Sequence, residues 1–374
     1  MTTETQSPQS TAKRGPRTGY ERWMEDQEIP VVYGFGFEDV RDVKRSHWAA
    51  VGCDAAFIQL YGQEAATGMF VAELGPGEEI RPQKHLYELV VLVLDGHGEA
   101  EVWAPGADAG HQTFQWQPYS LFSVPLNWHY TLRNTGSTPA IYAAVTNAPV
   151  MLDVFHDRGF IFDNDYFFAS RVAASANFSA QPERLTAGTG VRALRANLIS
   201  SVNDLPIDPD DRRGSGARIT AFEMGGNVLA GHLAEWPVRR RQKAHYHAPG
   251  AVLLITKSEG YSLMWPSQAG IRPYESGNED QVVRVPWRDG SAFCPPGQWF
   301  HQHFNTGEVA ARQVAIRYGS TEHPVGFEFG LQTDPDRTIV PTRTSLKAGG
   351  TTIDYEDEDP RISADYRRIV GEVT

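Results

Sequence analysis

The chain has 374 residues, of which 41% are apolar and 21% charged, the balance of an ordinary globular protein with one large domain or two smaller ones. Its formal net charge of −12 argues against a general nucleic-acid-binding protein, because contacts with phosphate need clustered Lys and Arg. The two cysteines exclude a disulfide framework, and no apolar run is long enough to span a membrane. We therefore expect a cytoplasmic protein with neither nucleic-acid nor membrane partners.

Residues 1–20 are polar and rich in Thr, Ser, Gln and Pro, and we expect a disordered arm without the apolar core of a signal peptide. The rest of the chain contains many short apolar or alternating runs that end at turn residues. Residues 89–94 before an Asp-Gly pair, and residues 252–256 before a Glu-Gly pair, are examples. Many short strands with regular turn signals predict an all-β sandwich or barrel.

Two long stretches of the chain are copies of each other. The interval from His85 to Gly98 equals that from His247 to Gly260, and a Trp follows in register in both copies. Further along, residues 120–129 match residues 291–301, and an Asn-Thr-Gly sequence closes each copy. A repeat of this length that occurs twice indicates tandem domains.

The repeat predicts a domain order that accounts for the whole chain. After the arm at 1–20, we expect a first β-barrel at 21–150 and a connector at 151–215. A second barrel at 216–320 and a C-terminal tail at 321–374 follow. The tail contains the acidic run 356–359, interpreted as a solvated surface, and a short predicted helix after it.

The second copy contains two pairs of histidines, His245 with His247 and His301 with His303. Residues i and i+2 of a β-strand point to the same face, so each pair directs two imidazoles into one space. Several neutral imidazoles are unfavourable to bury without a partner, and imidazole is a ligand of Fe, Zn, Cu and Ni. The pattern predicts a metal site built on strands, with hydrogen-bonded core histidines as the alternative.

These residues resemble the two motifs of the cupin superfamily, and their duplication resembles a bicupin. The first cupin motif has Gly, then His-x-His, then usually a Glu three or four residues later, then Gly. The second has Pro-x-Gly, a His, and an Asn four residues after that His. The matching positions are His245, His247, Gly297, His301 and Asn305 in the second copy, and Gly77, His85, Gly96, Pro125, His129 and Asn134 in the first. The resemblance implies tandem double-stranded β-helix (jelly-roll) barrels with a few short helices.

The second copy departs from the motif because the position of the Glu falls on Ala251 or Val252. It therefore resembles the three-histidine cupins, which include thiol, diketone and gentisate- or salicylate-type dioxygenases. The sequence from Trp299 is similar to the Trp-His-Asp-His-Gly-Asn of the last group, with one additional residue. That resemblance implies that His245, His247 and His301 bind the metal and that His303 faces the substrate. Because His301 and His303 share a strand face, the two roles could be exchanged.

In the first copy the His-x-His has become Gln83-Lys84-His85, and Glu88 is one residue out of register with the expected Glu. Only His85 and His129 keep ligand-like positions, whereas Zn and Fe normally have at least three protein ligands. We expect this barrel to hold no metal and to serve as a structural half or as a binding pocket.

Arg241, Lys243 and Trp299 are candidates for binding the substrate. The two basic residues share a strand face with His245 if that strand extends so far, and Arg binds carboxylates with two parallel hydrogen bonds. A solvated rim is the alternative for both. Trp299 would stack on an aromatic substrate, or pack in the core of the barrel.

The resemblance implies an Fe(II)-dependent dioxygenase that combines O₂ with a small, acidic or aromatic organic substrate, with His303 as the catalytic donor of a hydrogen bond or proton. The residues alone leave Mn, Ni, Cu and Zn open as the metal. They also leave open a redox-neutral lyase, decarboxylase or isomerase, and a non-catalytic binding or storage protein. Because exposed sheet edges tend to pair, we expect a homodimer.

Overall fold

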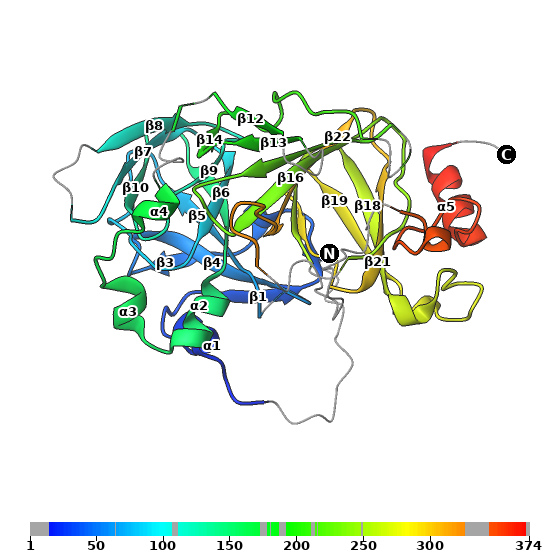
Figure 1. Ribbon diagram of the computed structural model, residues 1–374, viewed down its shortest axis with the longest axis horizontal. Helices are drawn as coiled ribbons and strands as arrows, with labels where there is room; N and C mark the ends of the chain where they lie inside the picture. Colours follow the sequence, from blue (N-terminus) through cyan, green and yellow to red (C-terminus); the bar gives the residue numbers. More distant parts are fainter. Residues whose placement is uncertain are drawn as a thin grey trace.

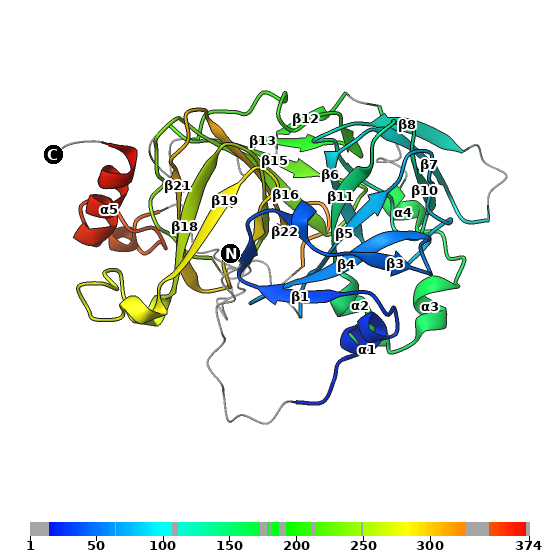
Figure 2. The same cartoon turned by 180° about the vertical axis from the view of Figure 1, so that it is seen from behind.

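The computed structural model describes residues 15–63, 65–106, 111–172, 178–179, 181–186, 192–210, 214, 216–247, 250–325 and 344–371. Most of the expected disordered arm, residues 1–14, lies outside them. The described chain forms two β-barrels side by side, with helices beside the first barrel and at the outer end of the second (Figures 1 and 2). None of the helices in these ranges combines the length and the apolar character needed to span a bilayer.

The first barrel consists of two sheets. The larger has the order β1-β4-β5-β11-β6-β9-β14, with β3 paired to β4, and the smaller has the order β10-β7-β8. Only the β1–β4 pair among them is parallel. The strands are β1 (Val31–Gly34), β3 (Ser46–Trp48), β4 (Cys53–Leu60), β5 (Gly68–Leu74), β6 (Leu89–Asp95), β7 (Gly98–Trp103), β8 (Gln112–Trp116), β9 (Leu121–Ser123), β10 (His129–Asn134), β11 (Ala140–Thr146) and β14 (Leu198–Ile199).

The second barrel repeats this arrangement. Its larger sheet has the order β12-β13-β15-β16-β22-β17-β20-β2, and its smaller sheet has the order β19-β18-β21. The strands are β2 (Gly36–Phe37), β12 (Glu183–Thr186), β13 (Arg192–Arg195), β15 (Arg218–Glu223), β16 (Leu229–Trp236), β17 (Val252–Lys257), β18 (Glu259–Pro266), β19 (Val283–Arg288), β20 (Ala292–Phe293), β21 (Trp299–Asn305) and β22 (Ala311–Tyr318). The predicted fold class, tandem barrels with a few short helices, is confirmed. The helices are α1 (Gly19–Glu25), α2 (Ala148–Phe155), α3 (Arg158–Phe162), α4 (Ala169–Val172) and α5 (Pro360–Val370).

The two barrels exchange short strands. β2 lies between β1 and β3 of the first barrel in the chain but pairs with β20 of the second, and β14 precedes most of the second barrel but pairs with β9 of the first. Gly36 of β2 allows this close approach, since a Cβ there would lie 2.7 Å from the Cβ of Phe293. Consequently, each barrel is completed by residues that the sequence order assigns to the other half of the chain.

Glu88 forms a second link between the barrels. Its carboxylate is 2% exposed and accepts hydrogen bonds from the backbone N–H groups of Val228 and Leu229, each at 2.9 Å. It also forms an ion pair with Arg171 of α4, whose guanidinium donates to the carbonyl of Gly226. A residue that lies next to a cupin ligand position therefore joins the first barrel to the start of β16.

His85 lies in the aromatic interior of the first barrel. Its Nδ1 is 2.7 Å from the carbonyl of Tyr87, its Nε2 is 3.2 Å from the hydroxyl of Tyr130, and its ring stacks on that of Tyr87. His129, at the end of β10, stacks instead on Trp103. Both ring nitrogens of His85 have hydrogen-bonding partners, which favours a structural role, and the absence of a metal from this barrel stays a prediction.

Acid should destabilise the protein through His85. Burial lowers its pKa from 6.5 to about 4, so between these pH values the unfolded chain binds a proton that the folded chain does not. The stabilisation is complete above pH 6.5 and is lost as the pH falls toward 4, by on the order of 3 kcal/mol. Urea unfolding of the wild type and His85→Gln at several pH values measures it. Equal pH dependence in both proteins would contradict this assignment.

Candidate metal centre

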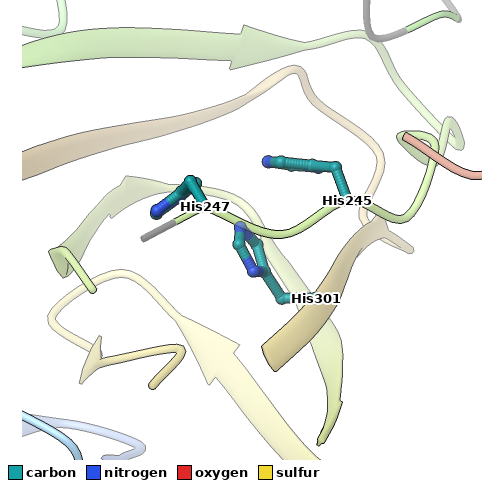
Figure 3. A group of neighbouring side chains, drawn as sticks. All are labelled: His245, His247 and His301. Atoms are coloured by element: carbon teal, nitrogen blue, oxygen red, sulfur yellow. The ribbon is translucent and has the colours of Figure 1, made fainter. Parts of the chain in front are cut away.

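Three histidines converge inside the second barrel. His245 and His247 lie in the segment between β16 and β17, His301 lies on β21, and one nitrogen of each ring is within 4.8 Å of the others (Figure 3). The backbones of His245 and His301 exchange two hydrogen bonds, of 3.1 and 2.8 Å. This reciprocal pair fixes the spacing of the two strands at the point where their imidazoles meet. His245 and His301 are buried and His247 is partly buried.

Two of the rings are oriented by backbone carbonyls. Nδ1 of His245 is 3.2 Å from the carbonyl oxygen of Lys243, and Nδ1 of His301 is 3.1 Å from that of Trp299. A carbonyl oxygen only accepts, so each Nδ1 carries the proton and a neutral ring presents the lone pair of Nε2. Metal-bound histidines are typically held in this way. The donor set therefore fits a divalent transition metal.

The group of three contains no carboxylate among the described residues. Ala251 and Val252, at the position of the usual cupin Glu, are 4% and 1% exposed and pack in the apolar core. Three neutral imidazoles suit Fe, Cu, Ni or Zn, and they do not compensate the charge of such an ion. The site can therefore bind an anionic ligand beside the metal.

His303 lies on the same strand face as His301 and is equally buried, and the two ring centroids are 5.5 Å apart. Its Nδ1 is 2.7 Å from Oγ of Ser262, and that oxygen accepts a hydrogen bond from Nε1 of Trp287. A hydroxyl has one hydrogen and two lone pairs, so Ser262 holds the ring of His303 in place with either tautomer of the imidazole. The ring stacks on Trp236, with centroids 5.0 Å apart. His303 is thus adjacent to the three clustered histidines but not one of them.

Trp299 lies toward the more exposed side of the site, again on the face of His301. It is partly buried and its ring centroid is 5.6 Å from that of Phe35, which in turn is 5.1 Å from that of Tyr61. The three rings come from the second barrel, the N-terminal segment and the first barrel. They form an aromatic wall beside the start of β21, the strand that carries His301, and contact between Trp299 and a substrate stays a prediction.

Arg241 and Lys243 are engaged by the C-terminal tail. Arg241 pairs with Phe304 and His245 pairs with His301, so the antiparallel register changes by one residue between the two pairs. Arg241 and Lys243 therefore do not continue the strand face of His245 in the way that the sequence pattern predicted. Arg241 lies 2.7 Å from the carboxylate of Glu358. Lys243 lies 2.7 Å from that of Asp354 and lowers its pKa. A direct contact of these two residues with substrate stays a prediction, which their ion pairs do not favour.

Few of the residues around this site were predictable from local sequence patterns. Glu358 is 6% exposed, and Asp359 is fully buried and caps the N-terminus of α5, so the acidic run interpreted as a solvated surface is in part buried. The Asp-Pro step before the helix was the available signal for the cap. No local pattern marked Ser262 as the hydrogen-bond partner of His303.

Two barrels of repeated topology, with the histidines of the His-x-His and Pro-x-Gly motifs in one of them, support the cupin superfamily. The architecture is that of a bicupin. No protein-family model and no curated protein matches the chain. The gentisate-type resemblance therefore receives no support from relatives.

Several solved structures share the general architecture at low similarity. Vicilin from Corylus avellana is 11% identical, over 75% of this chain and 84% of that one, with a TM-score of 0.46. The oxalate decarboxylase of Lactobacillus farciminis in a formate complex is 9% identical, over 76% and 86%, with a TM-score of 0.49. A variant of the Bacillus subtilis oxalate decarboxylase is 12% identical, over 84% and 86%, with a TM-score of 0.48. At these values the likenesses carry no argument about activity.

Proposed function

We propose that the second barrel is the active site of a mononuclear metal enzyme, in which His245, His247 and His301 hold a divalent transition-metal ion. The convergence of three ligand nitrogens within 4.8 Å carries this proposal. The carbonyl-oriented rings of His245 and His301 support it, because they present Nε2 in the tautomer that coordinates.

Within this class we propose an Fe(II)-dependent dioxygenase that acts on a small acidic or aromatic substrate. Bound iron would supply Lewis acidity and the capacity to combine O₂ with an organic compound. The neutral ligand set favours an anionic substrate, since it leaves the charge of the ion for the substrate to offset. The wall formed by Trp299 and Phe35 favours a planar, partly apolar one.

The protein's own contribution to the reaction comes from His303 and its surroundings. Ser262 holds Nδ1 of His303, and in the tautomer with the proton on Nε2 this ring would donate a hydrogen bond to negative charge that develops on a substrate oxygen. Trp236 and Phe293 pack against its ring, and this apolar packing excludes water from the buried side of the site. A redox-neutral lyase, decarboxylase or isomerase would use the same residues.

Freshly purified protein is expected to contain one equivalent of metal per chain, bound by the second barrel. Elemental analysis of the wild type, of a His245→Ala/His247→Ala double variant and of His85→Gln measures the content. The double variant should lose the metal because it removes two of three ligands, and His85→Gln should keep it. A metal lost with His85 and kept in the double variant would reverse the assignment.

Oxygen uptake then separates the two enzyme classes. The iron-loaded wild type is screened against small aromatic and aliphatic carboxylates with an oxygen electrode and with product analysis. Consumption of O₂ coupled to loss of a substrate supports the dioxygenase. Turnover without O₂ consumption identifies the redox-neutral class, and absence of turnover throughout the screen points to a binding or storage protein.

A further inference from the structure

The C-terminal tail, residues 344–371, extends the sheet that carries the histidines. Thr352 pairs with His245 in an antiparallel bridge. On either side, Ile353 N–H donates to the carbonyl of Ala244 at 2.8 Å, and Tyr246 N–H donates to that of Thr351 at 3.3 Å. The segment that carries His245 and His247 therefore lies between β21 and the tail, and it has backbone partners on both sides.

Glu358 of the tail joins the two segments that carry the clustered histidines. Its carboxylate accepts hydrogen bonds from Arg241, four residues before His245, and from Nε2 of Gln302, which directly follows His301. Gln302 also donates to the carbonyl of Gln242 at 2.8 Å. The Glu358 side chain is only 4% exposed. Solvent therefore screens its interactions weakly, and loss of the carboxylate would leave buried donors without their acceptor.

Aromatic contacts and a second ion pair hold the tail in this place. The guanidinium of Arg241 lies over the rings of Tyr355 and Tyr366, 4.8 and 5.6 Å from their centroids. The hydroxyl of Tyr355 donates to the carbonyl of Arg241 at 2.7 Å. Lys243, which pairs with Asp354, supplies from its own backbone the carbonyl that orients His245. The contacts of the tail thus reach the atoms that set the position of a ligand ring.

We propose that the C-terminal tail is a brace that, together with the backbone pairing of His245 and His301, holds the metal ligands in position, with Glu358 as the positioning residue; this rests on the proposed metal site. Without the Glu358 carboxylate, Arg241 and Gln302 lose their common partner, and the segments of His245 and His301 are held less firmly, by their backbone hydrogen bonds and the bond from Gln302 to Gln242. Groups that hydrogen-bond a metal ligand directly change metal affinity by about 10- to 100-fold when they are removed. Glu358 acts through Arg241 and Gln302, one contact further from the ligands, so the lower end of that range, about 10-fold, is the expected effect.

The test compares Glu358→Gln with Glu356→Gln. Both variants remove one negative charge and keep the shape of the side chain, but Glu356 is exposed, and among the described residues its carboxylate forms an ion pair with Lys347 of the tail itself. Binding of Co²⁺ to the metal-free proteins is measured by competition with a chelator, together with the visible absorption spectrum of bound Co²⁺. We expect Glu358→Gln to bind Co²⁺ about 10-fold more weakly, with an altered spectrum, and Glu356→Gln to match the wild type.

The outcomes separate this inference from the proposed function. Wild-type affinity and spectrum in Glu358→Gln would overturn the brace, even if the protein is an active metal enzyme. A wild type that binds no stoichiometric Co²⁺ would overturn the metal site and the brace with it. If Glu358→Gln does not fold, the comparison moves to Asp354→Asn and Asp357→Asn, because Asp354 pairs with Lys243 and Asp357 pairs with Lys347. Equal Co²⁺ affinities in that pair would also overturn the brace.

Discussion

His301→Ala is expected to purify without metal, whereas His303→Ala is expected to purify with metal and to be nearly inactive. His301 supplies one of three clustered nitrogens, so its loss leaves two protein ligands, fewer than Fe or Zn sites normally have. His303 lies beside the cluster and is held by Ser262, so its loss leaves the ligands in place. Removing a donor of this kind slows the reaction by about 10²- to 10⁴-fold. Elemental analysis and turnover of each variant are the measurements.

Ser262→Ala provides the matched control for this comparison. It removes the hydrogen bond to Nδ1 of His303 and leaves both rings in the protein, so metal content should stay at the wild-type level while turnover falls less than in His303→Ala. Loss of metal from His303→Ala together with its retention in His301→Ala would mean that the two histidines have exchanged roles. Full metal content and full activity in both variants would show that neither residue belongs to the site.

Glu88→Ala is expected to destabilise the whole protein by about 3–5 kcal/mol, the typical cost of breaking a buried ion pair by removing one partner. The substitution leaves Arg171 beside an apolar methyl group, and the N–H groups of Val228 and Leu229 lose their acceptor. Urea unfolding monitored by tryptophan fluorescence and circular dichroism gives the free energy of unfolding.

Glu101→Ala is the control for that substitution. Glu101 is another carboxylate of the first barrel, on β7, but its side chain is 39% exposed and pairs with His111 at the surface, so its loss should cost no more than about 1 kcal/mol. Equal effects of the two substitutions would show that Glu88 does not link the barrels as its contacts indicate. If the protein unfolds in two steps and Glu88→Ala affects only the second step, then Glu88 stabilises one barrel and does not link the two.

The fold could be predicted because the same pattern of short strands and turns occurs in two copies along the chain. Residues 89–94 and 252–256 fall within β6 and β17, which hold equivalent places in the two barrels. Apolar runs that end at turn residues are a local sign of β-strands. Because the same runs occur in both copies, each copy supports the strand prediction for the other. The exchanged strands β2 and β14 have two residues each, which is too short for any period to appear.

The candidate site was predictable in part, for a related reason. The alternation of His245 with His247 and of His301 with His303 is a property of extended backbone, and the structure brings three of these rings together. The surroundings of Arg241 were not predictable, because its face depends on a register change and its partner, Glu358, is 117 residues away in the chain. Pairing across such distances leaves no local pattern in the sequence.

The exchange of β2 and β14 also has a consequence for biosynthesis. β2 is made near the start of the chain, but its partner β20 is made more than 250 residues later, so the ribosome releases an N-terminal strand long before that strand can be paired. β9 is likewise synthesised before its partner β14, so its edge is unpaired until β14 has been made. Unpaired edges of this kind are where nascent β-proteins associate with one another, and distant pairings form slowly. The two barrels are therefore coupled during folding, because each needs a short strand from the other half of the chain to complete its larger sheet.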